Sequence, residues 1–171
     1  NTIVHVTHDQ VEAMTMGQRM CIMKDGEMVQ VGAPMEVYRN PATLFVADFV
    51  GRINALPATL QDGGLLVGDQ VFRCEHESLH GHAPGRDLRV YLRPEDVLAR
   101  PIPPDDPNVA DAEIDTIDFM GPYCLVRVSS ERLGSSKLTV YLSLNYLAEA
   151  RLEVGSRLPL RLLPDRMRVF S

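Results

Sequence analysis

Residues 6–10 combine residue types and a spacing that could bind an anion. The β-branched run at residues 2–7 predicts a strand that stops at a polar pair. Thr7 and Gln10 have the S/T-x-x-E/Q spacing of a capping box, which predicts a helix directly behind that strand. His8 would then lie at a strand end and in the first turn of a helix, where free backbone N–H groups attract phosphate. An imidazole N–H placed there could donate a charge-assisted hydrogen bond to a phosphate oxygen.

Two other interpretations of this segment must be weighed. A histidine at a strand end also serves as a structural hydrogen-bonding group. Asp9 and Glu12 are close to His8 in sequence and carry carboxylates that could transfer protons. We interpret Asp9 instead as a negative charge that complements the dipole of the following helix.

The elements that follow must position this segment. Helical spacing predicts a helix over residues 9–16 with its inner face at Val11, Met14 and Thr15, ended by a left-handed Gly17. Asp25 and Gly26 stand between the apolar runs 19–23 and 27–31, which predicts a β-hairpin. Short helices are expected over residues 34–38 and 44–50.

The pattern changes after Gly51 from helical spacing to alternation. Apolar and polar residues alternate over residues 110–114, 124–128, 138–144 and 158–162, as they do in half-buried strands of a small barrel or sandwich. We therefore predict two domains, residues 1–51 and 52–171. The second is mainly β.

Four blocks in the first region resemble the end of the nucleotide-binding domain of ATP-binding cassette (ABC) importers. The resemblance is to the branch that serves sugars, polyamines, sulfate, phosphonates and iron. The matching residues are Val6-Thr7-His8-Asp9-Gln10, Lys24-Asp25-Gly26 with its flanking strands, Glu36-Val37-Tyr38-Arg39-Asn40-Pro41, and Phe45-Val46-Ala47-Asp48-Phe49-Val50-Gly51.

The second region resembles the regulatory TOBE domain, an OB-like or MOP-like β-barrel, that follows the cassette in the same importers. The matching residues are Tyr91-Leu92-Arg93-Pro94-Glu95-Asp96-Val97, Asp118-Phe119-Met120-Gly121, and Gly155 through Met167-Arg168-Val169-Phe170. The implied fold class is mainly β: this barrel, preceded by a strand-helix-hairpin-helix remnant of an α/β P-loop ATPase domain.

The resemblance implies that His8 contacts the γ-phosphate of ATP, with Mg²⁺, when two intact subunits close. It implies a cytoplasmic subunit, held at the inner membrane by permease subunits, and a β-domain that joins two copies and could bind a regulator. The sequence contains no G-x-x-x-x-G-K-S/T phosphate loop, no Leu-Ser-Gly-Gly signature and no strand ending in Asp-Glu. We therefore expect a carboxyl-terminal piece that neither binds nor hydrolyses ATP alone. The alternative is a stand-alone sensor of small ligands or oxyanions.

Composition and charge limit the other function classes. A net charge of −6 and 6% aromatic residues disfavour a nucleic-acid partner, and no secretory signal pattern opens the chain. Cys74, His76, His80 and His82 are admissible zinc ligands, but their spacing matches no tight site, so no metal is expected. Arg93-Pro94-Glu95-Asp96 is either a turn with an internal ion pair or a contact with the ATPase or a second copy.

Overall fold

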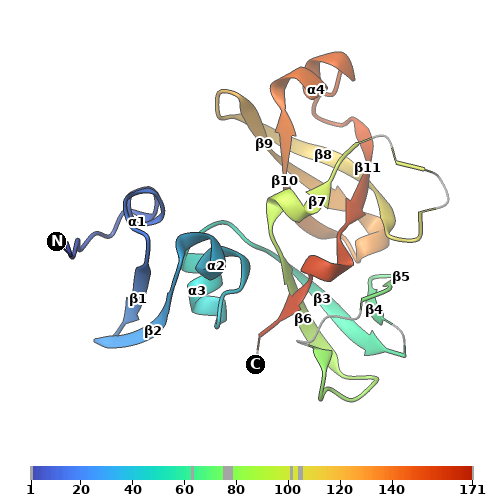
Figure 1. Cartoon of the computed structure of the whole chain (residues 1–171). Helices are drawn as coiled ribbons and strands as arrows, with labels where there is room; N and C mark the ends of the chain where they lie inside the picture. The colour runs from blue at the N-terminus through green and yellow to red at the C-terminus, as the bar shows by residue number, and fades with distance from the viewer. Residues whose placement is uncertain (1, 63, 75–78, 101, 104–105, 171) are drawn as a thin grey trace. The chain divides into compact units, whose positions relative to one another are not determined.

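The computed structural model describes residues 2–62, 64–74, 79–100, 102–103 and 106–170 (Figure 1). The chain folds as two compact units, with the boundary between Ile53 and Asn54. Each unit has its own hydrophobic core.

Unit 1 consists of short helices and one antiparallel hairpin. Its elements are α1 (Gln10–Met16), β1 (Met20–Lys24), β2 (Glu27–Gly32), α2 (Pro34–Arg39) and α3 (Leu44–Phe49). Asp25 and Gly26 both have positive φ, 51° and 85°, as a tight hairpin turn requires, so the predicted hairpin is confirmed. The predicted helices over residues 34–38 and 44–50 are also present, to within one residue.

The core of unit 1 is small. Met20 and Ile22 of β1 pack with Val37 of α2 and with Val46 and Val50 at α3, all less than 9% exposed. The Gln30 side chain donates to Asn40 O (2.9 Å) and accepts from Ala42 N (2.8 Å). This amide therefore fixes the connection between α2 and α3 to strand β2.

Three expectations about the start of the chain are wrong. Residues 2–7 form no strand, because no neighbouring strand among the described residues pairs with them. Of the predicted inner face of α1 only Met14 is partly buried, together with Ala13, whereas Val11 and Thr15 are exposed. Gly17 ends α1 in an extended conformation (φ −109°), not a left-handed one.

Unit 2, Asn54–Phe170, is built from two five-stranded antiparallel sheets. In chain order its elements are β3 (Asn54–Gln61), β4 (Gly64–Val67), β5 (Gln70–Phe72), β6 (Asp87–Leu92), the 3₁₀ turn η2 (Pro94–Asp96), β7 (Val97–Leu98), β8 (Val109–Phe119), β9 (Tyr123–Ser130), η3 (Glu131–Leu133), β10 (Ser136–Ser143), α4 (Leu144–Glu149), β11 (Arg157–Leu162), η4 (Pro164–Arg166) and β12 (Arg168–Val169).

The two sheets have the same strand arrangement. One runs β12-β6-β3-β4-β5 and the other β7-β11-β8-β9-β10. Unit 2 has two halves, β3 to β7 and β8 to β12. In each half a six-residue strand, β6 or β11, is followed by a proline-led 3₁₀ turn, and a two-residue strand then pairs with the other sheet. Thus β7 pairs with β11 through Leu98 and Arg161, and β12 pairs with β6 through Arg168 and Tyr91.

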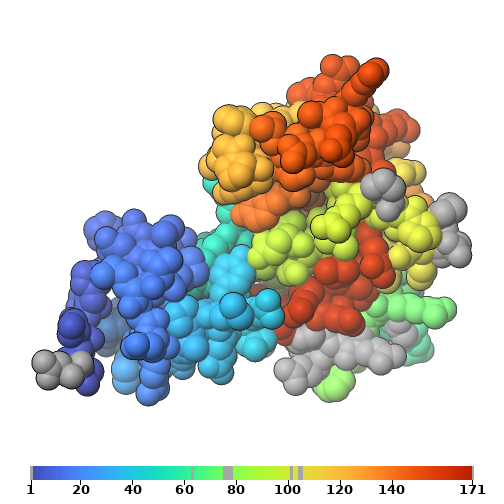
Figure 2. All heavy atoms as spheres, turned by 45° about the horizontal axis from the view of Figure 1, so that its top comes forward, coloured from blue at the N-terminus to red at the C-terminus, as the bar shows by residue number. Residues whose placement is uncertain are grey.

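This reciprocal exchange holds the halves together. The backbone N–H of Leu163, before η4, donates to the carbonyl of Asp96 at the end of η2 (3.1 Å). In Figure 2 the red carboxyl-terminal segment lies against the yellow-green segment that holds η2 and β7. One continuous hydrophobic core, including Leu56 and Phe72 from the first half and Val126 and Leu160 from the second, fills the space between the sheets.

The prediction of a mainly β, barrel-like domain behind a short mixed region is confirmed by this arrangement. The predicted alternating strands correspond to β8, β9, β10 and β11. Across the described ranges, no helix has both the length and the apolar character needed to cross a membrane.

Candidate functional site

His8 lies on the loop that precedes helix α1, and its side chain is exposed. Among the described residues, none makes a hydrogen bond or ion pair with its imidazole ring. The ring is therefore accessible to a ligand. This position is compatible with the predicted phosphate contact, which stays a prediction.

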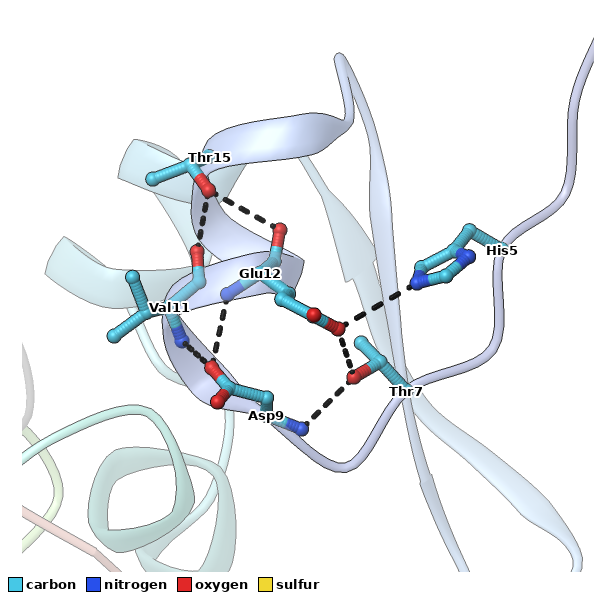
Figure 3. A network of polar contacts seen from close by, with 6 residues as sticks. All are labelled: His5, Thr7, Asp9, Val11, Glu12 and Thr15. Atoms are coloured by element: carbon cyan, nitrogen blue, oxygen red, sulfur yellow. Dashed lines mark hydrogen bonds and ion pairs between the residues drawn. The ribbon is translucent and has the colours of Figure 1, made fainter.

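The two residues that flank His8 are both anchored (Figure 3). Thr7 Oγ1 donates to Glu12 Oε2 over 2.7 Å and accepts from the backbone N–H of Asp9 over 3.0 Å. Asp9 Oδ1 accepts from the backbone N–H groups of Val11 (2.8 Å) and Glu12 (3.0 Å). The loop that carries His8 is thus closed onto the first turn of α1.

This geometry corrects the predicted capping box. The residue that caps α1 is Asp9, which has extended dihedral angles, and Thr7 contacts the Glu12 side chain instead of a helix N–H group. The interpretation of Asp9 as a negative charge at the helix start is confirmed. However, the Asp9 carboxylate already accepts the N–H groups of Val11 and Glu12. Those two N–H groups cannot hold a phosphate at the same time, which makes the His8 side chain more important for binding an anion at this loop.

The residue spacing did not predict Glu12 as a partner of Thr7. Glu12 Oε2 also lies 3.6 Å from His5 Nε2, with both side chains about half exposed, at 51% and 53%. Three polar side chains, His5, Thr7 and Glu12, therefore meet beside the loop in Figure 3. The available signal was the position of Glu12, three residues after the Asp9 cap, where an acid faces the helix start.

The cysteine and histidine cluster is only partly visible, because His76 lies outside the described residues. The buried Cys74 Sγ donates to Pro164 O (3.2 Å), and His82 Nδ1 lies 3.0 Å from Arg86 Nη1. Within the described ranges, no group of three or more Cys, His, Asp or Glu side chains could hold a metal ion.

A cleft is lined by residues of β8, β9, η3 and the start of β11. Its charged residues are Asp111, Glu113, Glu131, Arg132 and Arg157. Arg157 Nε is 4.0 Å from Glu113 Oε2, which partly neutralises both groups. Carboxylates outnumber guanidinium groups here, so this cleft does not support an oxyanion site.

The Arg93-Pro94-Glu95-Asp96 segment forms the turn η2 and its start. Arg93 is only 8% exposed, and its carbonyl accepts from the backbone N–H of Asp96 (3.0 Å). Burial raises the pKa of Asp96 above its ordinary value, Glu95 raises it further, and Arg166 opposes the rise. Arg166 belongs to η4, so charges of the two equivalent turns interact. These contacts favour the interpretation of residues 93–96 as a structural turn over their interpretation as a contact with the ATPase or a second copy.

Residues 90–170 match the TOBE domain family. The chain is 32% identical over 181 residues to the Fe(3+) ions import ATP-binding protein FbpC 2 of Rhizobium meliloti (strain 1021), covering 99% of this chain and 45% of the relative. It is 32% identical over 174 residues to the sn-glycerol-3-phosphate import ATP-binding protein UgpC of Vibrio vulnificus (strain CMCP6), covering 99% and 44%. The chain thus spans about half the length of the relatives it matches.

The fold of unit 2 has a solved counterpart. The cytoplasmic molybdate-binding protein ModG, with molybdate bound, superimposes with a TM-score of 0.56 at 15% identity, covering 68% of this chain and 94% of ModG. At that identity the likeness concerns the fold alone. The ATP-binding relatives match the chain through both units, which favours the importer interpretation over a stand-alone sensor. The chain therefore belongs to the family of ABC importer ATP-binding subunits, and it corresponds to a carboxyl-terminal part that contains a TOBE domain.

Proposed function

We propose that this chain is the carboxyl-terminal portion of the ATP-hydrolysing subunit of an ABC importer, which energises uptake of a solute across the inner membrane. Similarity to importer ATP-binding proteins over 99% of the chain is the observation that carries this proposal. Unit 1 would be the last part of the nucleotide-binding domain and unit 2 the regulatory domain, with the boundary close to residue 52.

His8 would be the residue of this chain that touches ATP. Its exposed imidazole would donate to the γ-phosphate and stabilise the charge that develops there during phosphoryl transfer. When bound, Mg²⁺ would neutralise phosphate charge. The described residues offer it no carboxylate cluster, so its ligands would come from elsewhere in the intact subunit.

The partners would be a second copy of the subunit and the transmembrane permease. We propose a cytoplasmic location, peripheral to the inner membrane through that permease. Large apolar side chains of unit 1 are exposed, including Ile3 (87%), Val6 (90%) and Met28 (71%). Exposed apolar residues of this kind favour burial against a neighbouring part of the intact subunit.

ATP turnover by a subunit of the relatives' full length, carrying this chain as its carboxyl-terminal part, tests the proposal. We expect His8→Ala to lower kcat by about a hundredfold or more, because loss of one donor at the transferring phosphoryl group has that order of effect. His80→Ala, which removes an exposed histidine of unit 2, is the matched control and should leave kcat unchanged. Undiminished turnover by the His8 variant would remove that residue from the reaction.

A further inference from the structure

The loop at His8 is held by a closed ring of hydrogen bonds that does not include His8 itself (Figure 3). Glu12 takes part twice. Its carboxylate accepts from Thr7 Oγ1, and its backbone N–H donates to Asp9 Oδ1. Thr7 Oγ1 also accepts from the backbone N–H of Asp9, so the ring runs Glu12, Thr7, Asp9 and back to Glu12. His8 is the one residue between the two linked positions 7 and 9.

The geometry of the ring restricts the backbone on both sides of His8. The hydroxyl of Thr7 bridges a side chain of α1 and the N–H of Asp9, with O···O and N···O distances of 2.7 and 3.0 Å. A hydroxyl-to-carboxylate bond of this length is a strong, charge-assisted one. Rotation of the peptide groups on either side of His8 would strain or break these bonds, so the contact between Glu12 and Thr7 restrains the backbone that carries the His8 side chain.

We infer that Glu12, acting through the Thr7 hydroxyl, is a positioning residue that aims the His8 imidazole at its phosphate ligand. This inference rests on the proposed function for its activity test, but the ring itself is present in the structure. Glu12 does not touch the ligand in this scheme. A misplacement of about 1 Å at a reacting group is enough to lower a rate by up to about a hundredfold.

The competing explanation is that Glu12 acts only through its charge. An acid in the first turn of a helix stabilises that helix through its dipole, and Glu12 also faces His5 at 3.6 Å. A charge effect would be lost in both Glu12→Gln and Glu12→Ala. A hydrogen-bond effect would be lost in Glu12→Ala and largely kept in Glu12→Gln, because the amide oxygen of glutamine still accepts from Thr7 Oγ1.

The experiment measures ATP turnover by the full-length subunit with variants at both ends of the bond. We expect Glu12→Ala and Thr7→Val each to lower kcat by about tenfold or more, with the KM for ATP unchanged within about twofold. Thr7→Ser and Glu12→Gln keep the donor and the acceptor and should retain most of kcat. Glu27→Gln, an exposed glutamate of β2, is the control for removing one carboxylate from unit 1.

A double variant separates positioning from general stability. If Glu12 works through His8, Glu12→Ala should cost nothing further in a His8→Ala background. An equal cost in both backgrounds, or a full kcat in Thr7→Val, would overturn the inference.

A measurement on the 171-residue chain distinguishes failure of this inference from failure of the proposed function. Amide hydrogen exchange reports the Asp9 N–H directly, and Thr7→Val should speed its exchange by about tenfold while Thr7→Ser does not. If the exchange of the Asp9 N–H responds in this way but His8→Ala leaves turnover unchanged, the hydrogen-bond ring is present and the proposed role of His8 is wrong. The inferred role of Glu12 then fails as well, because it acts through His8. If Asp9 exchange is the same in all variants, the inference fails whatever the role of His8.

Discussion

The side-chain amide of Asn54 pairs with the backbone of Thr139 at two points. Asn54 Nδ2 donates to Thr139 O (2.8 Å), and Thr139 N donates to Asn54 Oδ1 (2.7 Å). Asn54 begins β3 in one sheet, and Thr139 lies at the middle of β10, the end strand of the other. The amide thus supplies to the free edge of β10 the donor and acceptor that another strand would have supplied.

We predict that Asn54→Ala destabilises unit 2 by about 2–3 kcal/mol, because two polar backbone groups of Thr139 lose their partners in a site where Asn54 is only 5% exposed. The chain contains no tryptophan, so urea unfolding should be followed by circular dichroism. Asn145→Ala, at an exposed position of α4, is the matched control. Equal midpoints for the two variants would contradict this account of the β10 edge.

Gly68, in the turn between β4 and β5, approaches the β9–β10 connection closely. A Cβ atom on Gly68 would lie 2.3 Å from Arg132 O and 2.4 Å from Gly134 N, and its φ is +61°. We predict a loss of about 2–4 kcal/mol in the free energy of unfolding for Gly68→Ala, since both obstacles are backbone atoms that cannot rotate away.

The control for Gly68→Ala is Gly85→Ala. Gly85 also has a positive φ (+84°), but nothing lies within 4 Å of an added Cβ atom. That variant should lose only the backbone penalty of about 1–2 kcal/mol. A smaller loss at Gly68 than at Gly85 would show that the two turns separate readily.

The pKa of Asp96 is raised from 3.8, chiefly by burial, so folding favours its protonated form. The stability that this group contributes is therefore fully present below pH 3.8 and is lost as pH rises through the raised pKa. We predict that the melting temperature of the Asp96→Asn variant increases relative to that of the unsubstituted chain as pH rises from about 4 to 7. Asp165→Asn, an exposed position of η4, is the control, and parallel pH profiles for the two variants would contradict the prediction.

The three cysteines should differ sharply in reactivity. Cys21 is exposed, whereas Cys74 and Cys124 are buried. We predict that a thiol-specific reagent modifies one cysteine rapidly in the folded chain and all three after denaturation, because a thiol must be accessible to react. Cys21→Ser should abolish the rapid phase. Rapid modification of that variant would indicate that unit 2 opens readily.

Local signals were sufficient for much of the fold. Asp25 and Gly26 predicted a hairpin correctly, because the turn that needs positive φ at two adjacent positions depends only on those residues. Alternation predicted β8, β9, β10 and β11, since a strand with one buried face must repeat every two residues. The family resemblance likewise rested on contiguous motifs and is confirmed.

The site was predicted less completely. The sequence placed His8 at a strand end and in the first turn of a helix, and it assigned the cap to Thr7, whereas His8 lies on the loop before α1. The structure assigns the cap to Asp9 and joins Thr7 to Glu12. Both arrangements fit the same residue spacing. Only the backbone conformation at Asp9 decides which side chain reaches the free N–H groups.

The sequence alone determined the hairpin of β1 and β2, the strands β8, β9, β10 and β11, and the family to which the chain belongs. The tertiary structure decided which segments pair. Residues 2–7 have strand-forming residues and no neighbour among the described strands, whereas the two-residue strands β7 and β12 exist because β11 and β6 lie beside them. A residue pattern records which face of a strand is apolar. The hydrogen bonds that make the strand part of a sheet are formed with another segment, and only the folded chain brings the two segments together.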